Sequence, residues 1–311
     1  MKKLFIATLA IAALASCNKD QVINFDKFPI NFGEAFVDNS VRVDYSNANT
    51  LQGFNVYGTV TGTAGIVPLF DGDGATVSRN GAAYNAAWNC SESEYWIPGA
   101  SYSFAAVVDA TPTIVNGLPT ALKTIADDAA TDNMNLKDML YATQSVAGTS
   151  VTADYNELVK FTFSHLLSKV KFTVKSNAEG TYKHTVTNIT VSNYTEGTYT
   201  IDGGTWAHAT ATDKNVAFAS IEGVTSTDTN GVSNADMLLV PTTSDFVVTF
   251  TVELYKGTTQ LGTETKNITV SQDLVKGNAY NFLINCVVGK EIQFSVTNDP
   301  TWAVQPDITV Q

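Results

Sequence analysis

The chain of 311 residues has few of the side chains that carry most catalytic and metal chemistry. It contains three histidines, three cysteines and only two arginines, Arg42 and Arg79. The histidines, His165, His184 and His208, have no Cys, Asp or His at metal-ligand spacing, and no HExxH, CxxC, GxSxG or GxxxxGK(S/T) motif is present. We therefore predict a protein that is not an enzyme, with no catalytic residue, metal or cofactor.

Positive charge is also scarce, with 18 Lys and Arg against 30 Asp and Glu and a formal net charge of −12. Such a surface repels phosphate backbones, which argues against nucleic acid as a partner. The acidic residues do not form ligand sets either. Asp71-Gly72-Asp73-Gly74 lacks the later acidic ligands of a calcium loop and is typical of a tight turn. Glu92 and Glu94 flank a loop and could be taken for a catalytic carboxylate pair, but any acidic surface contains such pairs.

Long apolar runs are absent except at the N-terminus, where Lys2-Lys3 precedes the apolar stretch Leu4 to Leu14. Leu14-Ala15-Ser16-Cys17 then has the form of a lipobox, and the apolar stretch is too short for a permanent membrane helix. We predict a lipoprotein signal peptide over residues 1–16 and lipidation of Cys17 with fatty acyl chains such as palmitate. The alternative is an ordinary secretory leader with an incidental cysteine.

Two cysteines then remain, Cys90 and Cys286. An oxidising compartment permits a disulfide between them that would close a very long loop. Two separate buried thiols fit the sequence equally well, because free cysteine behaves as a small apolar residue.

Helical periodicity is missing over any ten residues, whereas short alternating segments recur between turns rich in Thr, Ser, Asn and Gly. This pattern predicts an all-β, antiparallel sandwich architecture, and the length suits two domains. We expect a loop over Thr111 to Thr131, and a helical turn or a strand over Leu136 to Ala142. We expect an aromatic strand pair made of Tyr95-Trp96 and residues 102–107, broken at Pro98-Gly99. The other expected strands are 28–32, 41–45, 51–60, 186–194, 216–221, 237–240, 246–255, 266–270, 279–287 and 291–296.

The apolar alternation of residues 160–175 changes side in the middle of the stretch. It falls first on odd and then on even positions: Phe161, Phe163 and Leu167, then Leu166, Val170, Phe172 and Val174. Because residues two apart share a face of a strand, the buried face must switch near Leu166-Leu167. We predict a bulge, a bend or a passage from one sheet to another there.

The end of the sequence carries an apolar row with a period of two, made of Trp302, Val304, Pro306, Ile308 and Val310. An extended segment of this kind can close its own sheet, or it can complete the sheet of a neighbouring molecule.

Four aromatic residues could belong either to a sugar-binding surface or to the core. Tyr95, Trp96, Trp206 and Trp302 could stack on sugars if exposed, but aromatic residues of a β-sandwich are more often part of the core.

Several motifs give the chain a family resemblance. Phe163-Ser-His-Leu-Leu-Ser-Lys-Val-Lys-Phe172 resembles the central strand of fimbrillin-like lipoproteins, the type V pilus subunits of Bacteroides-type bacteria. Other similar stretches follow the family order: Gly53–Gly58, Tyr95–Gly99 with Tyr102–Ala106, Asp138–Ala142, and Lys276–Phe282. The resemblance implies two transthyretin-like antiparallel β-sandwich domains in tandem, which we place at residues 17–155 and 156–311.

The resemblance also implies a function and a mode of assembly. Subunits of this family are exported as lipoproteins to the cell outer membrane and built into a surface fimbria that supports adhesion to host or bacterial receptors. In stalk subunits a protease removes an N-terminal strand, often after an arginine, and a C-terminal segment of another fimbrial subunit takes its place. Here the implied cleavage is at Arg42, which would otherwise be a solvated strand residue, and the removable strand is Lys27 to Phe32.

The implied donor strand contains Trp302, Val304, Ile308 and Val310. The alternative function is that of a monomeric glycan-binding lipoprotein on the cell surface.

Overall fold

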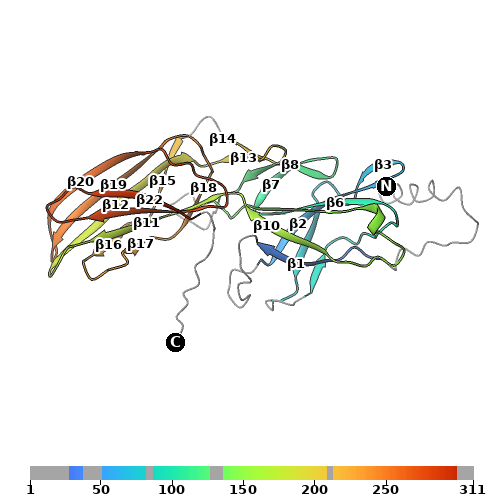
Figure 1. Ribbon diagram of the computed structural model, residues 1–311, viewed down its shortest axis with the longest axis horizontal. Helices are drawn as coiled ribbons and strands as arrows, with labels where there is room; N and C mark the ends of the chain where they lie inside the picture. Colours follow the sequence, from blue (N-terminus) through green and yellow to red (C-terminus); the bar gives the residue numbers. More distant parts are fainter. Residues whose placement is uncertain (1–27, 38–50, 82–86, 127–135, 209–212, 300–311) are drawn as a thin grey trace, which may run out of the picture.

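The computed structural model describes residues 28–37, 51–81, 87–126, 136–208 and 213–299. Within these residues the regular structure is β-strand, apart from one 3-10 turn, η2 (Gly148–Ser150). The strands group into two halves that lie end to end along the long axis (Figure 1). No helix in the described part is long and apolar enough to cross a membrane.

Eight of the described strands form the sheet of the N-terminal half, in the order β1-β10-β9-β6-β2-β4-β5, with β3 paired to β2. The strand β10 pairs along most of its length with β1, and only its last residues, Ser164 and His165, pair with β9. The sheet therefore turns a corner at β10. The bounds of these strands are β1 (Phe32–Val37), β2 (Gly53–Gly62), β3 (Gly65–Pro68), β4 (Ala75–Arg79), β5 (Trp88–Cys90), β6 (Ser101–Val108), β9 (Leu140–Val146) and β10 (Val159–His165).

The N-terminal core lies between the β1–β10 pair and the facing strands β2, β4, β6 and β9. Aromatic rings dominate it, because the inward positions of several strands are Phe, Tyr or Trp. Phe54 of β2 lies edge-on to Phe161 of β10 at 5.4 Å between ring centroids, and Phe32 lies edge-on to Phe104 at 6.0 Å. Such tilted pairs add to the burial of apolar area that stabilises the half.

The C-terminal half is a sandwich of two sheets around a second apolar core. Rings meet across it, as Phe250 and Phe294 do at 6.1 Å. One sheet contains β11 (Ser168–Ser176), β17 (Val232–Ser233), β18 (Met237–Leu239), β21 (Ala279–Cys286) and β22 (Gln293–Asp299), and the other contains β12 (Tyr182–Tyr194), β15 (Asp213–Ala217), β16 (Ile221–Val224), β19 (Phe246–Lys256) and β20 (Thr259–Val270).

A smaller sheet joins the two halves, and Figure 1 shows it between them. Its order is β14-β13-β8-β7, from β7 (Ala110–Val115), β8 (Leu118–Thr124), β13 (Gly197–Thr200) and β14 (Thr205–His208). A third apolar cluster beneath it includes Leu122, Leu167, Tyr199 and Val240. Two strands of this sheet come from before residue 155 and two from after it, and the domain boundary at that residue stays a prediction.

The predicted change of face near Leu166-Leu167 is confirmed. The strand β10 buries Val159, Phe161 and Phe163, and β11, in a different sheet, buries even-numbered positions from Ser168 on. Leu166 and Leu167 are both buried between the two strands, in the cluster under the joining sheet. The chain therefore passes from one sheet to another at this point, as the alternation required.

Other expectations need correction. The loop expected over Thr111 to Thr131 is wrong in its first part, where β7 and β8 form a hairpin. The opening strand begins later than expected, at Phe32, and residues 28–30 are extended with only a bridge from Pro29 to Tyr95. The strand expected at Tyr95-Trp96 is wrong, because Tyr95 forms only this bridge. Of the helical turn and the strand left open for Leu136 to Ala142, the strand is found, and it begins at Leu140. Two strand pairs of the described fold, β1–β10 and β11–β21, are parallel, although the other pairs are antiparallel. The strand expected at 41–45 lies outside the described residues.

Candidate functional site: the first strand and the groove that holds it

The strand β1 lies at the edge of its sheet and pairs with one neighbour. Its register with β10 is parallel, from Phe32 opposite Val159 to Val37 opposite Phe163, with a shift between Gly33 and Ala35. Just before the strand, the Ile30 N–H donates to the Glu94 carbonyl at 2.7 Å, and the Trp96 N–H donates to the Phe28 carbonyl at 2.8 Å. A short extended segment therefore closes one side of the N-terminal core.

The inward side chains of this segment belong to the core rather than to the surface. Ile30, Phe32 and Ala35 are buried, and Phe32 is only 5% exposed. The ring of Phe32 lies 6.2 Å from Phe161, stacked on it, and 6.4 Å from Phe70. Removal of the segment would leave an apolar groove lined by these aromatic rings. An exposed groove with an open strand edge is a site at which another strand can add.

Arg79 lies at the end of β4, on the inward side of the N-terminal sheet, and the sequence did not indicate it as a site residue. The burial of β4 alternates, so Arg79 faces the core with Ala75 and Val77 and is only 9% exposed. Its guanidinium carbon lies 6.0 Å from the centre of the Trp88 ring. The Nε and Nη2 atoms are enclosed and have no hydrogen-bond partner within the described structure.

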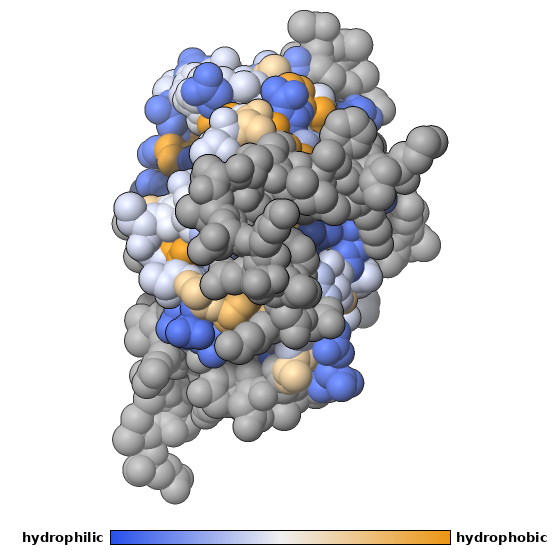
Figure 2. All heavy atoms as spheres, turned by 90° about the vertical axis from the view of Figure 1, so that its right-hand side faces the viewer, coloured by the Kyte–Doolittle hydropathy of each residue, from blue (hydrophilic) through white to orange (hydrophobic). Residues whose placement is uncertain are grey.

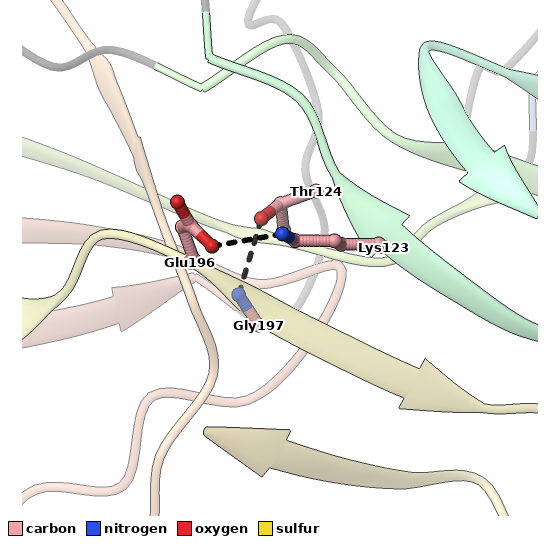
Figure 3. Close-up of polar contacts among 4 residues, drawn as sticks. All are labelled: Lys123, Thr124, Glu196 and Gly197. Carbon is pink, nitrogen blue, oxygen red and sulfur yellow. Dashed lines mark hydrogen bonds and ion pairs between the residues drawn. The ribbon is translucent and has the colours of Figure 1, made fainter. Parts of the chain in front are cut away.

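The sheet between the halves is held by polar contacts as well as by its core (Figure 3). Lys123 Nζ lies 3.0 Å from Glu196 Oε2, and the Gly197 N–H donates to Thr124 Oγ1 at 3.1 Å. From the C-terminal sandwich, Lys276 Nζ donates to the Tyr199 hydroxyl at 2.6 Å. These contacts fix β13 on β8 and connect both to the turn before β21. The two halves are thus joined by backbone pairing, not only by a linker.

The three histidines each have a partner that accounts for them within the fold. Burial lowers the pKa of His184. Among the described residues, no group of three or more His, Cys, Asp or Glu is placed to hold a metal ion. The contacts are His165 Nδ1 to Asp138 Oδ1 at 2.9 Å, His184 Nδ1 to Ser176 Oγ at 2.8 Å, and His208 Nε2 to the Pro241 carbonyl at 2.8 Å.

The acidic turn of residues 71–74 is a tight turn, as its sequence indicated. The Gly74 N–H donates to the Asp71 carbonyl at 2.8 Å, and Gly74 has a φ of +74°. A Cβ at this position would lie 2.6 Å from the Tyr57 ring, so the turn requires glycine for both its backbone and its packing.

The two cysteines of the described chain are not bridged. Cys90 lies on β5 in the N-terminal half and Cys286 on β21 in the other, and both are free thiols. Burial raises the pKa of the Cys286 thiol to about 12 and also raises that of Cys90. The sequence left open a disulfide or two separate thiols, and the structure has two separate thiols.

Of the aromatic residues considered for sugar stacking, one is fully buried and two are half-buried. Trp96 is 2% exposed and lies edge-on to Tyr102 at 4.7 Å. Trp206 is half-buried against Tyr199, and Tyr95 is half-buried. Seen from the end of the N-terminal half, the coloured surface has small separate apolar patches among polar ones (Figure 2). Trp96 is therefore a core residue, and Trp302 lies outside the described residues.

The remaining predicted site residues lie outside the described residues, and their roles stay predictions. They are Cys17 for lipidation, Arg42 for cleavage, and Trp302, Val304, Ile308 and Val310 for strand donation.

Comparison with known proteins identifies the class first by fold. The chain is similar to a solved fimbrial protein from Bacteroides vulgatus, with 16% identity, a TM-score of 0.63, and coverage of 89% of this chain and 100% of that one. A candidate cell adhesion protein from Bacteroides uniformis follows with 17% identity, a TM-score of 0.55, and coverage of 88% and 97%. No curated protein matches the chain significantly. At these identities the likeness establishes the β-sandwich fold.

The family is established by sequence. The Fimbrillin-like family matches residues 42–300, most of the chain, and the protein therefore belongs to that family. The match begins at Arg42 and leaves out β1 on one side and residues 301–311 on the other.

Proposed function

We propose that the protein is a structural, non-enzymatic subunit of a cell-surface fimbria that supports adhesion. It is exported as a lipoprotein through Cys17 to the outer membrane, and it joins other fimbrial subunits by strand exchange after cleavage at Arg42. Family membership supports the fimbrial role, and so does the fimbrial description of the similar structure from Bacteroides vulgatus.

One observation carries the mode of assembly. Ile30 and Phe32, at and just before the start of the edge strand β1, complete the N-terminal core. Among the described strands β1 pairs only with β10, and Arg42 lies five residues beyond the end of β1. Cleavage at Arg42 would cut the covalent link between β1 and β2 while leaving the groove intact. The apolar row from Trp302 to Val310 would then supply a replacement, with main-chain hydrogen bonds for affinity and alternate side chains for register.

Two complementary variants test this proposal. A chain that lacks residues 302–311 keeps the groove but has no donor strand, and an Arg42→Gln chain keeps the donor strand but cannot release β1. Neither should polymerise alone after treatment with an arginine-specific protease. Mixed together, they should form a dimer that does not extend, because each has one functional half of the joint.

The readout is the mass of the assemblies by light scattering and their persistence in mild detergent. Polymers from either variant alone would rule out strand exchange at these two segments. Monomers from the mixture would do so as well, provided that the unaltered chain polymerises in the same conditions.

A further inference from the structure

Arg79 carries a charge that the fold encloses, and no acidic partner of it is found among the described residues. Its side chain is 9% exposed, and its Nε and Nη2 atoms are buried and unbonded among the described residues. Enclosing an unpaired charge is strongly unfavourable, and buried polar groups of native proteins are almost always hydrogen-bonded. The contact with the Trp88 ring at 6.0 Å does not use these two N–H groups.

The geometry of the open donors indicates the class of ligand. Nε and one terminal nitrogen form the side edge of a guanidinium, where two N–H groups point the same way. This edge matches the two oxygens of a carboxylate in a bidentate pair, which is the arrangement that distinguishes arginine from lysine. Arg79 is therefore built to receive a carboxylate.

The position of Arg79 connects it to the groove of β1. Its cross-strand neighbour Trp88 packs on Phe54 at 5.4 Å, and Phe54 packs on Phe163 at 5.5 Å. Phe163 is paired with Val37, the last residue of β1. Phe54 also packs on Phe161 at 5.4 Å, and Phe161 is paired with Ala35. Ring contacts thus connect Arg79 to the β1–β10 pair around Ala35 and Val37, and no described side chain bonds its Nε or Nη2.

The register of β1 shows how a replacement strand could supply one. The pairing with β10 shifts between Gly33 and Ala35, so the backbone of Glu34 has no opposite residue in the β1–β10 ladder. The buried positions change from even to odd numbers at this shift, with Ile30 and Phe32 before it and Ala35 after it. A strand that follows the same path must contain the same shift.

Residues 302–309 fit this path at one offset. With Trp302 at the place of Ile30 and Val304 at that of Phe32, Pro306 falls on the unpaired position of Glu34. Proline is tolerated at such a bulge because no ladder hydrogen bond is lost. Asp307, the only acidic residue of 302–311, then takes the inward position of Ala35.

We propose that Arg79 is a carboxylate-binding site, and that Asp307 of a second copy of this chain fills it when residues 302–309 of that copy replace β1 in the same direction and register. The inference rests on the proposed strand exchange. The chain's own β1 leaves the charge of Arg79 unpaired, and the entering strand pairs it. The incoming strand therefore binds more tightly than the strand that it displaces.

The test uses the chain cut after Arg42 by an arginine-specific protease, with β1 still seated, and a fluorescein-labelled peptide of residues 300–311 with an amidated end. Asp307 is the only carboxylate of the peptide part of this probe, and the dye is the same on both peptides. Binding is measured by fluorescence anisotropy for the native chain and for Arg79→Met, each with the native peptide and with an Asp307→Asn peptide. Either substitution should weaken binding by about 10-fold or more, and both together should weaken it no further.

The outcomes separate the two proposals. If the native peptide does not bind the cut chain, strand donation itself is wrong. If it binds and neither substitution matters, strand donation stands and the Arg79 site is wrong.

The unfolding midpoint of the uncut chain gives a second measurement. Arg79→Met should raise it or leave it unchanged, because the variant removes an unpaired buried charge. A clear decrease would mean that Arg79 stabilises its own chain rather than being left unpaired there, which would overturn the inference.

Discussion

The ring of Phe32 on β1 lies stacked on that of Phe161 on β10, with 6.2 Å between centroids and 12° between planes. Phe32 thereby holds the edge strand onto the strand that also leads into the second half of the molecule. Since its ring is enclosed by Phe70 and Phe104 as well, loss of the ring would leave a cavity.

We therefore expect Phe32→Ala to lower the free energy of unfolding of the uncut chain by about 3 kcal/mol. Urea denaturation measures this directly. The exposed neighbour Asn31, changed to alanine, is the matched control and should alter stability by less than about 0.5 kcal/mol. A loss of under about 1 kcal/mol for Phe32→Ala would show that β1 contributes little to the core.

The junction between the halves gives a second prediction, because β13 approaches its neighbours without room for a side chain at Gly197. A Cβ there would lie 2.8 Å from Val240 Cγ1 and 2.9 Å from the Trp206 ring. Gly197→Ala should reduce stability by about 1–3 kcal/mol through overpacking. Gly262 on β20 has no atom within 4 Å of such a Cβ, so Gly262→Ala should be neutral or slightly stabilising. Equal effects of the two substitutions, compared by thermal unfolding, would contradict the tight junction.

His184 makes stability depend on pH. Burial lowers its pKa from the ordinary 6.5, so the unfolded chain takes up the proton more readily than the folded chain. The stability that neutral His184 provides is full above pH 6.5 and is lost as the pH falls from there towards the lowered pKa. His184→Asn should flatten the decline of stability between about pH 7 and pH 5. An identical decline in both proteins would exclude His184 as its source.

The two thiols of the described chain should behave as separate groups. Without reductant, alkylation followed by mass spectrometry should find Cys90 labelled slowly in the native state and Cys286 labelled only after unfolding, since burial raises the pKa of Cys286 to about 12. A peptide that contains both residues joined by a disulfide would contradict the structure.

The alternation of apolar residues was enough to predict the change of buried face at Leu166-Leu167, because the buried positions of one flat strand are either all odd or all even. The hairpin of β7 and β8 was not predicted, although the dipeptide Asn116-Gly117 is typical of a two-residue hairpin turn. Both residues have positive φ, 52° and 82°, as in a tight hairpin turn, and the prolines at 112 and 119 concealed the strands. Pro112 is tolerated because β7 is an edge strand.

The buried position of Arg79 could not be read from the sequence. Its place on the inward side of β4 is consistent with the alternation from Ala75 and Val77, but an arginine in such a row normally reaches solvent. Its enclosure depends on Trp88 of the next strand and on the packing of the aromatic core. The parallel pairing of β1 with β10 likewise depends on how distant segments meet, and apolar periodicity does not encode that.

The most direct test of the whole account is the N-terminal sequence and intact mass of the protein recovered from the cell surface. The recovered chain should start at Val43 and form multimers that resist mild heating. A monomer that still carries an acylated Cys17 and an intact Arg42-Val43 bond would contradict assembly by proteolysis and strand exchange.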